Sequence, residues 1–162
     1  MHPFSVGWLA DGRPRFVPST AEAVIELLRF YEIPIRGCHA VVIGRSTVIG
    51  RPAAYLLLRN DATVTIAHKH TEDVARFTRE ADIVVVGVGR AGFLSGEMVR
   101  PGATVIDAGI NMTPQGLAGD VDAETVSTVA AALSPVPGGL GAVTTALLLR
   151  NVVEATERQT RG

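Results

Sequence analysis

Residues 39–52 read HAVVIGRSTVIGRP, and this stretch decides the fold. It begins with a β-branched, apolar run over residues 39–44, which predicts a short buried strand. A loop bounded by Gly44 and Gly50 follows. Residues 51–60 then have the pattern of a helix, with Pro52 tolerated in its first turn. A strand, a glycine loop and a helix in this order are the first elements of a parallel βαβ unit.

The same alternation continues on both sides of this stretch. Ser19 to Glu22 has the spacing of a capping box and predicts a helix that runs from Ser19 until Pro34 stops it. Further strands are expected over residues 62–67, 82–87, 103–108 and 133–136, and further helices over residues 72–80, 122–132 and 144–158.

Almost continuously apolar strands that alternate with helices predict an α/β fold: a doubly wound, parallel-sheet, Rossmann-like domain with helices on both faces. We expect the whole chain, residues 1–162, to form one such domain. Ligands bind at the carboxyl ends of the strands in these sheets. The site is therefore expected in the loops that follow Ile43, Ala67, Val86 and Ala108.

Composition excludes several classes of protein. The chain carries 15 basic and 16 acidic residues, a net charge of −1, which argues against a general nucleic-acid binder. Its one cysteine, Cys38, cannot form an internal disulfide, and no apolar run approaches the roughly 20 residues that a membrane helix needs. The sequence therefore predicts a soluble cytoplasmic protein without a membrane partner.

The first glycine loop has the pattern G-x-S-x-x-x-G over residues 44–50. Gly44 would leave the strand in a tight turn, and Gly50 would let the next helix approach the sheet closely. The amino terminus of that helix then offers free amides and a positive dipole end, which suit a pyrophosphate. Glycine loops also occur as simple turns, so the pattern by itself leaves both interpretations open.

The end of the second strand favours NADP over NAD. An NAD-binding domain places a carboxylate about 20 residues after the first glycine, whereas this chain has Lys69, its only lysine, with His68 and His70 beside it. Arg45 can converge on the same point, and two cations there indicate a 2′-phosphate. The alternative is a solvated basic turn.

Metal and acid–base chemistry find little support in the sequence. His68 and His70 form an H-x-H pair, but no third ligand has a telling spacing, so no metal site is expected. No paired-carboxylate or Ser-His-Asp motif stands out. Asp107 and Asp120 are interpreted as structural groups at strand ends.

Residues 135–144, PVPGGLGAVT, form a third unusual segment. Its prolines and glycines predict a rigid, bent backbone with exposed amides before the last helix. Glycines let backbone approach a ligand closely, so the segment suits a wall for a flat ring. An ordinary strand–helix connection is the alternative.

Together these stretches resemble the bifunctional methylenetetrahydrofolate dehydrogenase/methenyltetrahydrofolate cyclohydrolase family, and specifically its C-terminal NADP-binding domain. The likeness runs from His2-Pro3 through VVIGRSTVIGRP, ATVTIAHKHT, DIVVVGVG, VIDAGIN and GDV to PVPGGLG. The resemblance implies that Gly44, Arg45 and Ser46 hold the cofactor phosphates and that Lys69 and Arg45 hold the 2′-phosphate. The other expected cofactor-binding residues are Gly50, His68, Gly89 and Ile110, and Pro137, Gly138 and Gly139 would border the pterin and the nicotinamide.

The resemblance also implies a function in one-carbon metabolism and purine biosynthesis. The family transfers a hydride from 5,10-methylenetetrahydrofolate to NADP and hydrolyses the product to 10-formyltetrahydrofolate. A lysine and a tyrosine of an N-terminal substrate domain, of about a hundred residues, serve the second step. We expect that domain to be absent from this chain, so no catalytic residue is assigned. Ala21 and Ala142 replace prolines of the family pattern.

Two other functions stay open. One is a different Rossmann-type dehydrogenase domain; the other is a non-catalytic NADP-binding paralogue or partner subunit. Without a substrate domain, the helices near Ser19 and over residues 144–158 would leave apolar faces uncovered. We therefore expect a homo-oligomer or a complex with a separate substrate domain. The residues expected on those faces are Val24, Leu28, Tyr31, Leu148, Val152 and Ala155.

Overall fold

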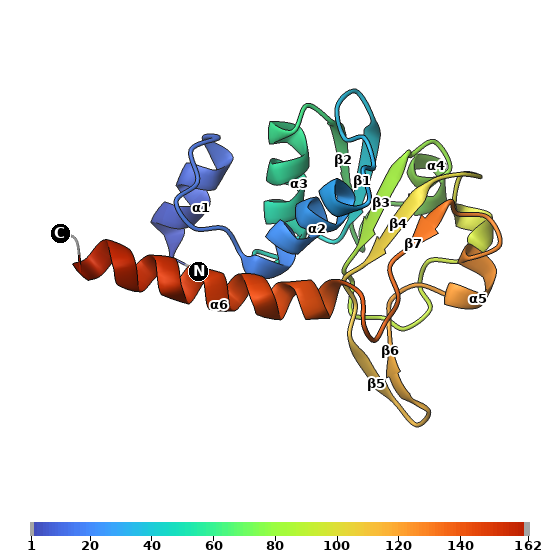
Figure 1. The fold of residues 1–162 in the computed structure, drawn as a ribbon. Coiled ribbons are helices and arrows are strands. Elements are labelled where there is room, and N and C mark those ends of the chain that lie inside the picture. Colours follow the sequence, from blue (N-terminus) through green and yellow to red (C-terminus); the bar gives the residue numbers. More distant parts are fainter. Residues whose placement is uncertain (1, 161–162) are drawn as a thin grey trace.

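A computed structural model describes residues 2–160 of the chain. A five-stranded parallel sheet with the order β2-β1-β3-β4-β7 forms its centre, and a two-stranded antiparallel hairpin, β5–β6, projects from it (Figure 1). The strands are β1 (His39–Ile43), β2 (Thr63–Ala67), β3 (Ile83–Val86), β4 (Thr104–Asp107), β5 (Asn111–Thr113), β6 (Gly116–Ala118) and β7 (Ala132–Leu133). The helices are α1 (Pro3–Ala10), α2 (Ser19–Phe30), α3 (Gly50–Arg59), α4 (Val74–Thr78), the short 3₁₀ helix η1 (Gly96–Met98), α5 (Ala123–Val126) and α6 (Leu140–Thr160).

Alternate residues of the central strands enter two separate cores. Val42 and Val85 pack with α1, α2, α3 and α6, whereas Val41, Val84 and Val86 pack with α4, η1 and α5. Figure 1 shows α2 and α3 on one side of the sheet and α4 and α5 on the other. Because successive side chains of a strand point to opposite faces, both faces of an apolar strand need a cover. The prediction of a doubly wound α/β domain is confirmed.

The predicted capping box at Ser19 is wrong. Pro18 is the residue before the first turn of α2, and no side chain caps that end. Ser19 Oγ instead accepts a hydrogen bond from Asn151 Nδ2 at 3.3 Å, and Glu22 Oε1 accepts one from Arg150 Nη2 at 2.5 Å. Both partners lie on α6, so tertiary contacts between α2 and α6 replace the local cap.

Other elements differ from the predictions in length. The helix expected over residues 122–132 is only α5, Ala123–Val126, and the strand expected over 133–136 is Ala132–Leu133. Pro135 and Pro137 have no backbone N–H to donate, so the ladder cannot continue past Ser134. The last helix begins at Leu140 rather than at Thr144. Helix α1 and the hairpin β5–β6 were not predicted.

The apolar faces of α2 and α6 are only partly uncovered. Val24 and Leu28 are fully buried, so the prediction that they are exposed is wrong. They face inward because α2 packs against both α3 and α6. Tyr31, Leu148 and Val152 are exposed as expected, and Leu149 and Val153 are exposed beside them. Ala155 is half-buried. Within the described residues, no helix is both long enough and apolar enough to cross a membrane.

The burial of Leu28 gives a direct test of this packing. Leu28→Ala should lower the free energy of unfolding by about 3 kcal/mol, because it removes buried methyl groups and leaves a cavity. Tyr31→Ala, three residues further on the exposed side, is the matched control and should cost under about 1 kcal/mol. Urea denaturation of the two variants measures both values. Equal losses would show that α2 does not pack as described.

Candidate functional site

The candidate site lies where the parallel strands end. Gly44 N donates to Ala67 O at 2.8 Å, Gly87 N donates to Ile43 O at 2.9 Å, and Ala108 N donates to Val86 O at 2.8 Å. These bonds hold the ends of β2, β1, β3 and β4 in one row. The chain proceeds from β1 to β2 on one side and then to β3 on the other side of β1. The strand order therefore reverses between β1 and β3, which is where ligands bind in sheets of this kind.

Gly44 and Gly50 cannot be replaced without moving backbone. A Cβ on Gly44 would lie 2.3 Å from the carbonyl oxygen of Gly87, and Gly44 has a φ of 118°. A Cβ on Gly50 would lie 2.2 Å from the carbonyl oxygen of Gly44. The two glycines therefore let the first loop fold tightly between β1, the end of β3 and the start of α3, as their positions in the sequence predicted.

The loop between them presents unpaired backbone donors. Ser46 Oγ accepts hydrogen bonds from the amides of Ile49 and Gly50, at 3.1 and 3.3 Å, and so caps the start of α3. Among residues 2–160, the amides of residues 45–48 have no hydrogen-bond acceptor. Successive free amides before a helix amino terminus form a cradle that suits the oxygens of a phosphate.

The loop after β2 carries two side chains with different roles. His68 is half-buried, and its Nδ1 accepts from the amide of His70 at 3.3 Å and lies 3.2 Å from Thr71 Oγ1. His68 therefore stabilises the turn on which Lys69 is displayed. Lys69 is exposed, as is Arg45, and neither forms an ion pair within the described part of the chain. Across residues 2–160, no three His, Cys, Asp or Glu side chains are grouped so that they could hold a metal ion.

Behind the loops, two carboxylates are buried. Asp107, at the end of β4, accepts from the amides of Gly109, Asp120 and Val121 at 2.8 to 3.0 Å. Burial raises the pKa of the Asp107 carboxyl; the three amide donors lower it, and the nearby Asp120 carboxylate raises it again. The interpretation of Asp107 as a structural group fits these contacts.

Asp120 holds the loop that follows β3. Its Oδ2 accepts from the amides of Val88 and Gly89 at 2.6 and 2.8 Å. Its Oδ1 accepts from the amide of Arg90 and from Asn111 Nδ2, both at 2.8 Å. The predicted cofactor residue Gly89 is therefore fixed by Asp120, although Gly89 itself is exposed. Asn111 was not predicted; the motif GIN at residues 109–111 was the only signal for it.

Two glycines make room for these carboxylates. A Cβ on Gly109 would lie 2.2 Å from Cγ of Asp120, and a Cβ on Gly119 would lie 1.9 Å from Oδ2 of Asp107. Each aspartate thus packs on the glycine that belongs to the other segment. The predicted residue Ile110 follows Gly109 directly and is 70% exposed at the base of the hairpin.

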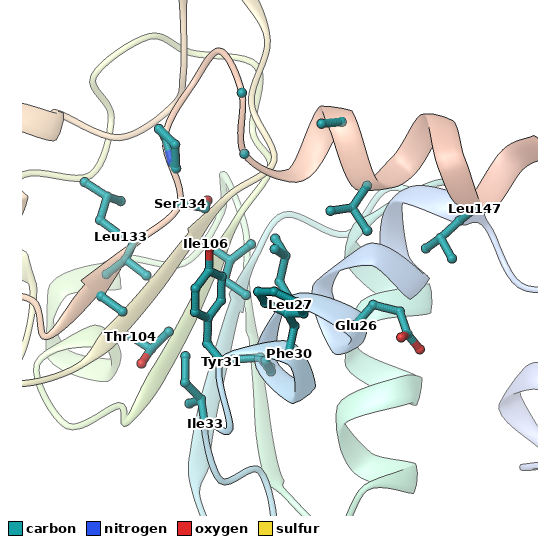
Figure 2. Close-up of a pocket in the computed structure, with 18 of the residues that line it drawn as sticks. Glu26, Leu27, Phe30, Tyr31, Ile33, Thr104, Ile106, Leu133, Ser134 and Leu147 are labelled. Carbon is teal, nitrogen blue, oxygen red and sulfur yellow. The ribbon is translucent and has the colours of Figure 1, made fainter.

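The glycine segment after β7 lies at the far end of the row from Lys69. Gly139 N donates to Pro135 O at 2.9 Å, a Cβ on Gly139 would lie 2.4 Å from that oxygen, and the Val136–Pro137 peptide is cis. Gly138 and Gly139 also line a groove of about 680 Å³ between α2 and α6 (Figure 2). Figure 2 shows Leu27 of α2 and Tyr31, the residue after α2, in this groove, opposite Leu133 of β7.

The predicted site residues therefore do not all share one cavity. The groove is lined by neither the first glycine loop nor Lys69, Gly89 or Ile110. A second hollow, of about 560 Å³, lies between α6 and the segment 16–20 and includes Val48 of the first loop. The structure arranges the predicted residues as a row of loops across the strand ends rather than as a closed pocket.

Comparisons with known proteins match this arrangement. The sequence pattern of the tetrahydrofolate dehydrogenase/cyclohydrolase family, NAD(P)-binding domain, matches residues 18–160. The bifunctional protein FolD of Nocardia farcinica is 57% identical over 157 residues, which are 96% of this chain and 56% of that protein. The chain thus spans about half the length of the curated relatives it matches.

Solved structures agree with the sequence relatives. The bifunctional FolD enzyme of Campylobacter jejuni superposes with a TM-score of 0.94 at 42% identity, covering 98% of this chain and 57% of that one. The Trypanosoma brucei dehydrogenase-cyclohydrolase, solved with NADP and an inhibitor, gives 0.92 at 41% identity and covers 99% of this chain and 58% of that one.

The raised pKa of Asp107 predicts a pH dependence of stability. Its value in the unfolded chain should be about 4, so the folded protein takes up this proton first as the pH falls. Above its raised pKa the buried Asp107 carboxylate is charged, and its burial lowers the free energy of unfolding by the full amount. As the pH falls through that pKa, the carboxylate is protonated and the free energy of unfolding should rise. Urea denaturation between about pH 7 and pH 4 should show the parent gaining stability relative to Asp107→Asn, which cannot titrate. A relative loss over that interval would contradict the assignment.

Proposed function

The chain belongs to the tetrahydrofolate dehydrogenase/cyclohydrolase family, and on that premise we propose that it is the NADP-binding domain of an enzyme of folate chemistry. That enzyme would oxidise 5,10-methylenetetrahydrofolate to the methenyl form and hydrolyse this to 10-formyltetrahydrofolate. The observation that carries the proposal is the first loop, in which Gly44 and Gly50 leave no room for a Cβ and four successive amides have no acceptor within the described residues.

The cofactor phosphates would sit on this loop. The free amides of residues 45–48 offer donors without any side-chain rearrangement, and the positive end of the α3 dipole favours an anion beside them. Ser46 Oγ already accepts two amides, so its hydroxyl proton stays available for a phosphate oxygen. Arg45, exposed on the same loop, adds a positive charge.

The choice of NADP over NAD would depend on Lys69 and Arg45. Both cations are exposed and have no ion-pair partner within residues 2–160. No acidic residue occurs from Ala62 to Thr71 to repel a 2′-phosphate. His68, through its bonds within the turn, would hold Lys69 in place.

The remaining predicted residues would receive the other half of the dinucleotide. The row from β2 to β7 spans four inter-strand spacings, roughly 19 Å, so an extended ligand can lie across it. Gly89 and Ile110 would line the nicotinamide side, and Pro137, Gly138 and Gly139 would border the nicotinamide and the pterin. NADP, when bound, supplies the hydride acceptor; these residues would orient the ring and exclude water.

The catalytic groups would come from another domain. The family's lysine and tyrosine match no position here, and Lys69 lies in the proposed 2′-phosphate site. The relatives are nearly twice as long as this chain, and their remaining length is where a substrate domain would lie. A non-catalytic NADP-binding paralogue remains the alternative.

A substrate domain would dock on α6 and α1. Leu148, Leu149, Val152 and Val153 of α6 are all more than half exposed, and Phe4 of α1 is 75% exposed. Ser5 of α1 lines the same hollow as Leu148 and Val152, so α1 borders this apolar face of α6. Such a surface favours a partner, either this domain or a second copy of the chain. The thiol of Cys38, which forms no disulfide, fits a reducing compartment such as the cytoplasm. The proposed enzyme would act there in a pathway that supplies purine biosynthesis.

Cofactor preference tests the role of Lys69. Lys69→Ala should weaken NADP binding roughly tenfold and leave NAD binding little changed, because one charge-assisted hydrogen bond to the 2′-phosphate is lost. Arg59→Ala, which removes an exposed cation at the end of α3, is the control and should change neither affinity. Calorimetric titration with both dinucleotides measures the effect. Equal affinities of the parent for NADP and NAD would refute the preference.

Mixing the chain with a separate substrate domain tests whether that domain supplies the catalytic groups. The chain alone should turn over neither methylenetetrahydrofolate nor its methenyl product. A substrate domain taken from the Nocardia farcinica relative should restore both activities and sediment with the chain as one complex. Leu148→Asp should abolish the complex without unfolding the chain, since Leu148 is 55% exposed. Turnover by the chain alone would contradict this proposal, and NADP binding without any turnover in the complex would favour the non-catalytic alternative.

A further inference from the structure

Residues 119–121 run between the loop after β3 and the loop after β4. The carbonyl oxygens of Gly119 and Asp120 accept from the amides of Gly92 and Leu94, at 3.3 and 3.1 Å. On the other side, Asp107 accepts the amides of Asp120 and Val121. The segment is therefore held from both sides, and the Asp120 side chain is fully buried within it.

We infer that Asp120 is a positioning residue for the cofactor: it sets the place of the Val88–Arg90 backbone and, through Asn111, fastens the base of the β5–β6 hairpin to it. The two loops that carry Gly89 and Ile110 then move as one body. This inference depends on the proposed function, in which these loops line the nicotinamide side of NADP.

The contacts of Asp120 require a carboxylate. Its two oxygens accept four N–H donors, two on each oxygen: the amides of Val88 and Gly89 on Oδ2, and the amide of Arg90 with Asn111 Nδ2 on Oδ1. An amide side chain has one acceptor oxygen, and its NH₂ group would face two donors. A longer acid does not fit, because the Asp120 carboxyl already lies where a Cβ of Gly109 would be.

The two buried aspartates act on different parts of the structure. Asp107 accepts only amides of the buried segments 109 and 119–121, so its loss should lower stability. Asp120 accepts amides of Val88, Gly89 and Arg90, three exposed residues of the loop that follows β3. Its loss should therefore displace a surface that the cofactor contacts.

Calorimetric titration of the chain with NADP tests the inference. Asp120→Asn should weaken NADP about tenfold, because two of the four donors lose their acceptor. Asp82→Asn is the matched control: Asp82 also accepts a backbone amide, that of His39, and the guanidinium of Arg100, but it lies at the amino ends of the strands. The control should keep the parent's affinity within about twofold.

A double variant provides the rescue. Asp120→Asn together with Asn111→Asp exchanges amide and carboxylate across the same contact, so the new NH₂ group at 120 meets an acceptor. The oxygen at 120 can accept from Val88 and Gly89. The Arg90 amide loses its acceptor, and the Ala118 carbonyl oxygen loses the donor that Asn111 Nδ2 supplies at 3.3 Å. NADP affinity should recover to within about threefold of the parent. A loss of stability alone does not predict such a recovery.

Amide hydrogen exchange without cofactor separates this inference from the proposed function. The amides of residues 88–90 should exchange faster in Asp120→Asn than in the parent and in Asp82→Asn. If the parent does not bind NADP, the proposed function fails, and unchanged exchange at 88–90 would then overturn the positioning role as well. With a parent that binds, an unaltered affinity in Asp120→Asn, a double variant no better than the single one, or an equal loss in Asp82→Asn overturns the inference. Should Asp120→Asn not fold, Asn111→Ala replaces it: a loss of about threefold supports the inference and parental affinity overturns it.

Discussion

Asp107 and Asp120 are buried behind the strand ends, and their carboxylates need hydrogen-bond donors. The contacts that supply those donors determine most of the geometry of the site. Burying a charge costs several kcal/mol unless donors surround it. Here six backbone amides and Asn111 supply them. Those donors come from the loops after β3 and β4 and from the segment that follows the hairpin. The need to satisfy two charges therefore joins three pieces of chain that are distant in sequence, and Gly109 and Gly119 are glycines because a Cβ at either position would occupy the place of a carboxylate.

The first glycine loop, residues 44–50, is not held by any buried carboxylate among residues 2–160. Its shape depends on the absence of side chains at Gly44 and Gly50 and on one hydroxyl, that of Ser46, rather than on buried charge. Its amides at residues 45–48 stay unpaired within the described chain. A loop that used those donors internally would be more stable and would have none left for a phosphate. The loops near β4 and near β1 thus differ: near β4 the amides hold the backbone, and near β1 they are free for the proposed phosphate.

The order of strands and helices could be predicted from the sequence, because apolar β-branched runs and glycine loops are local signals. The loops of the site could be placed for the same reason, since parallel strands put their carboxyl ends at one edge. Contacts between distant segments could not be predicted. Ser19 and Glu22 had the spacing of a cap, but Asn151 and Arg150 of α6 took those side chains. Val24 and Leu28 were placed on an open face, but α3 and α6 cover it. The motif GIN marked Asn111 but not its role, because that role exists only when Asp120 lies next to it.

Helix α6 connects the domain to the surface on which a partner is proposed to bind. Its first half buries Leu140 and Leu147 against the domain and holds α2 through Arg150 and Asn151. Beyond that point the helix extends past the sheet (Figure 1), and its apolar residues are exposed. Within the described residues, the contacts there are peripheral, such as the Arg158 guanidinium 4.9 Å from the ring of Phe16. Helix α6 is anchored at its start and carries exposed apolar residues in its middle, so it would hold a domain bound there in a fixed position relative to the glycine segment that precedes it. Because Gly138 and Gly139 directly precede α6, a domain docked on the helix would be held in fixed register with the proposed nicotinamide wall.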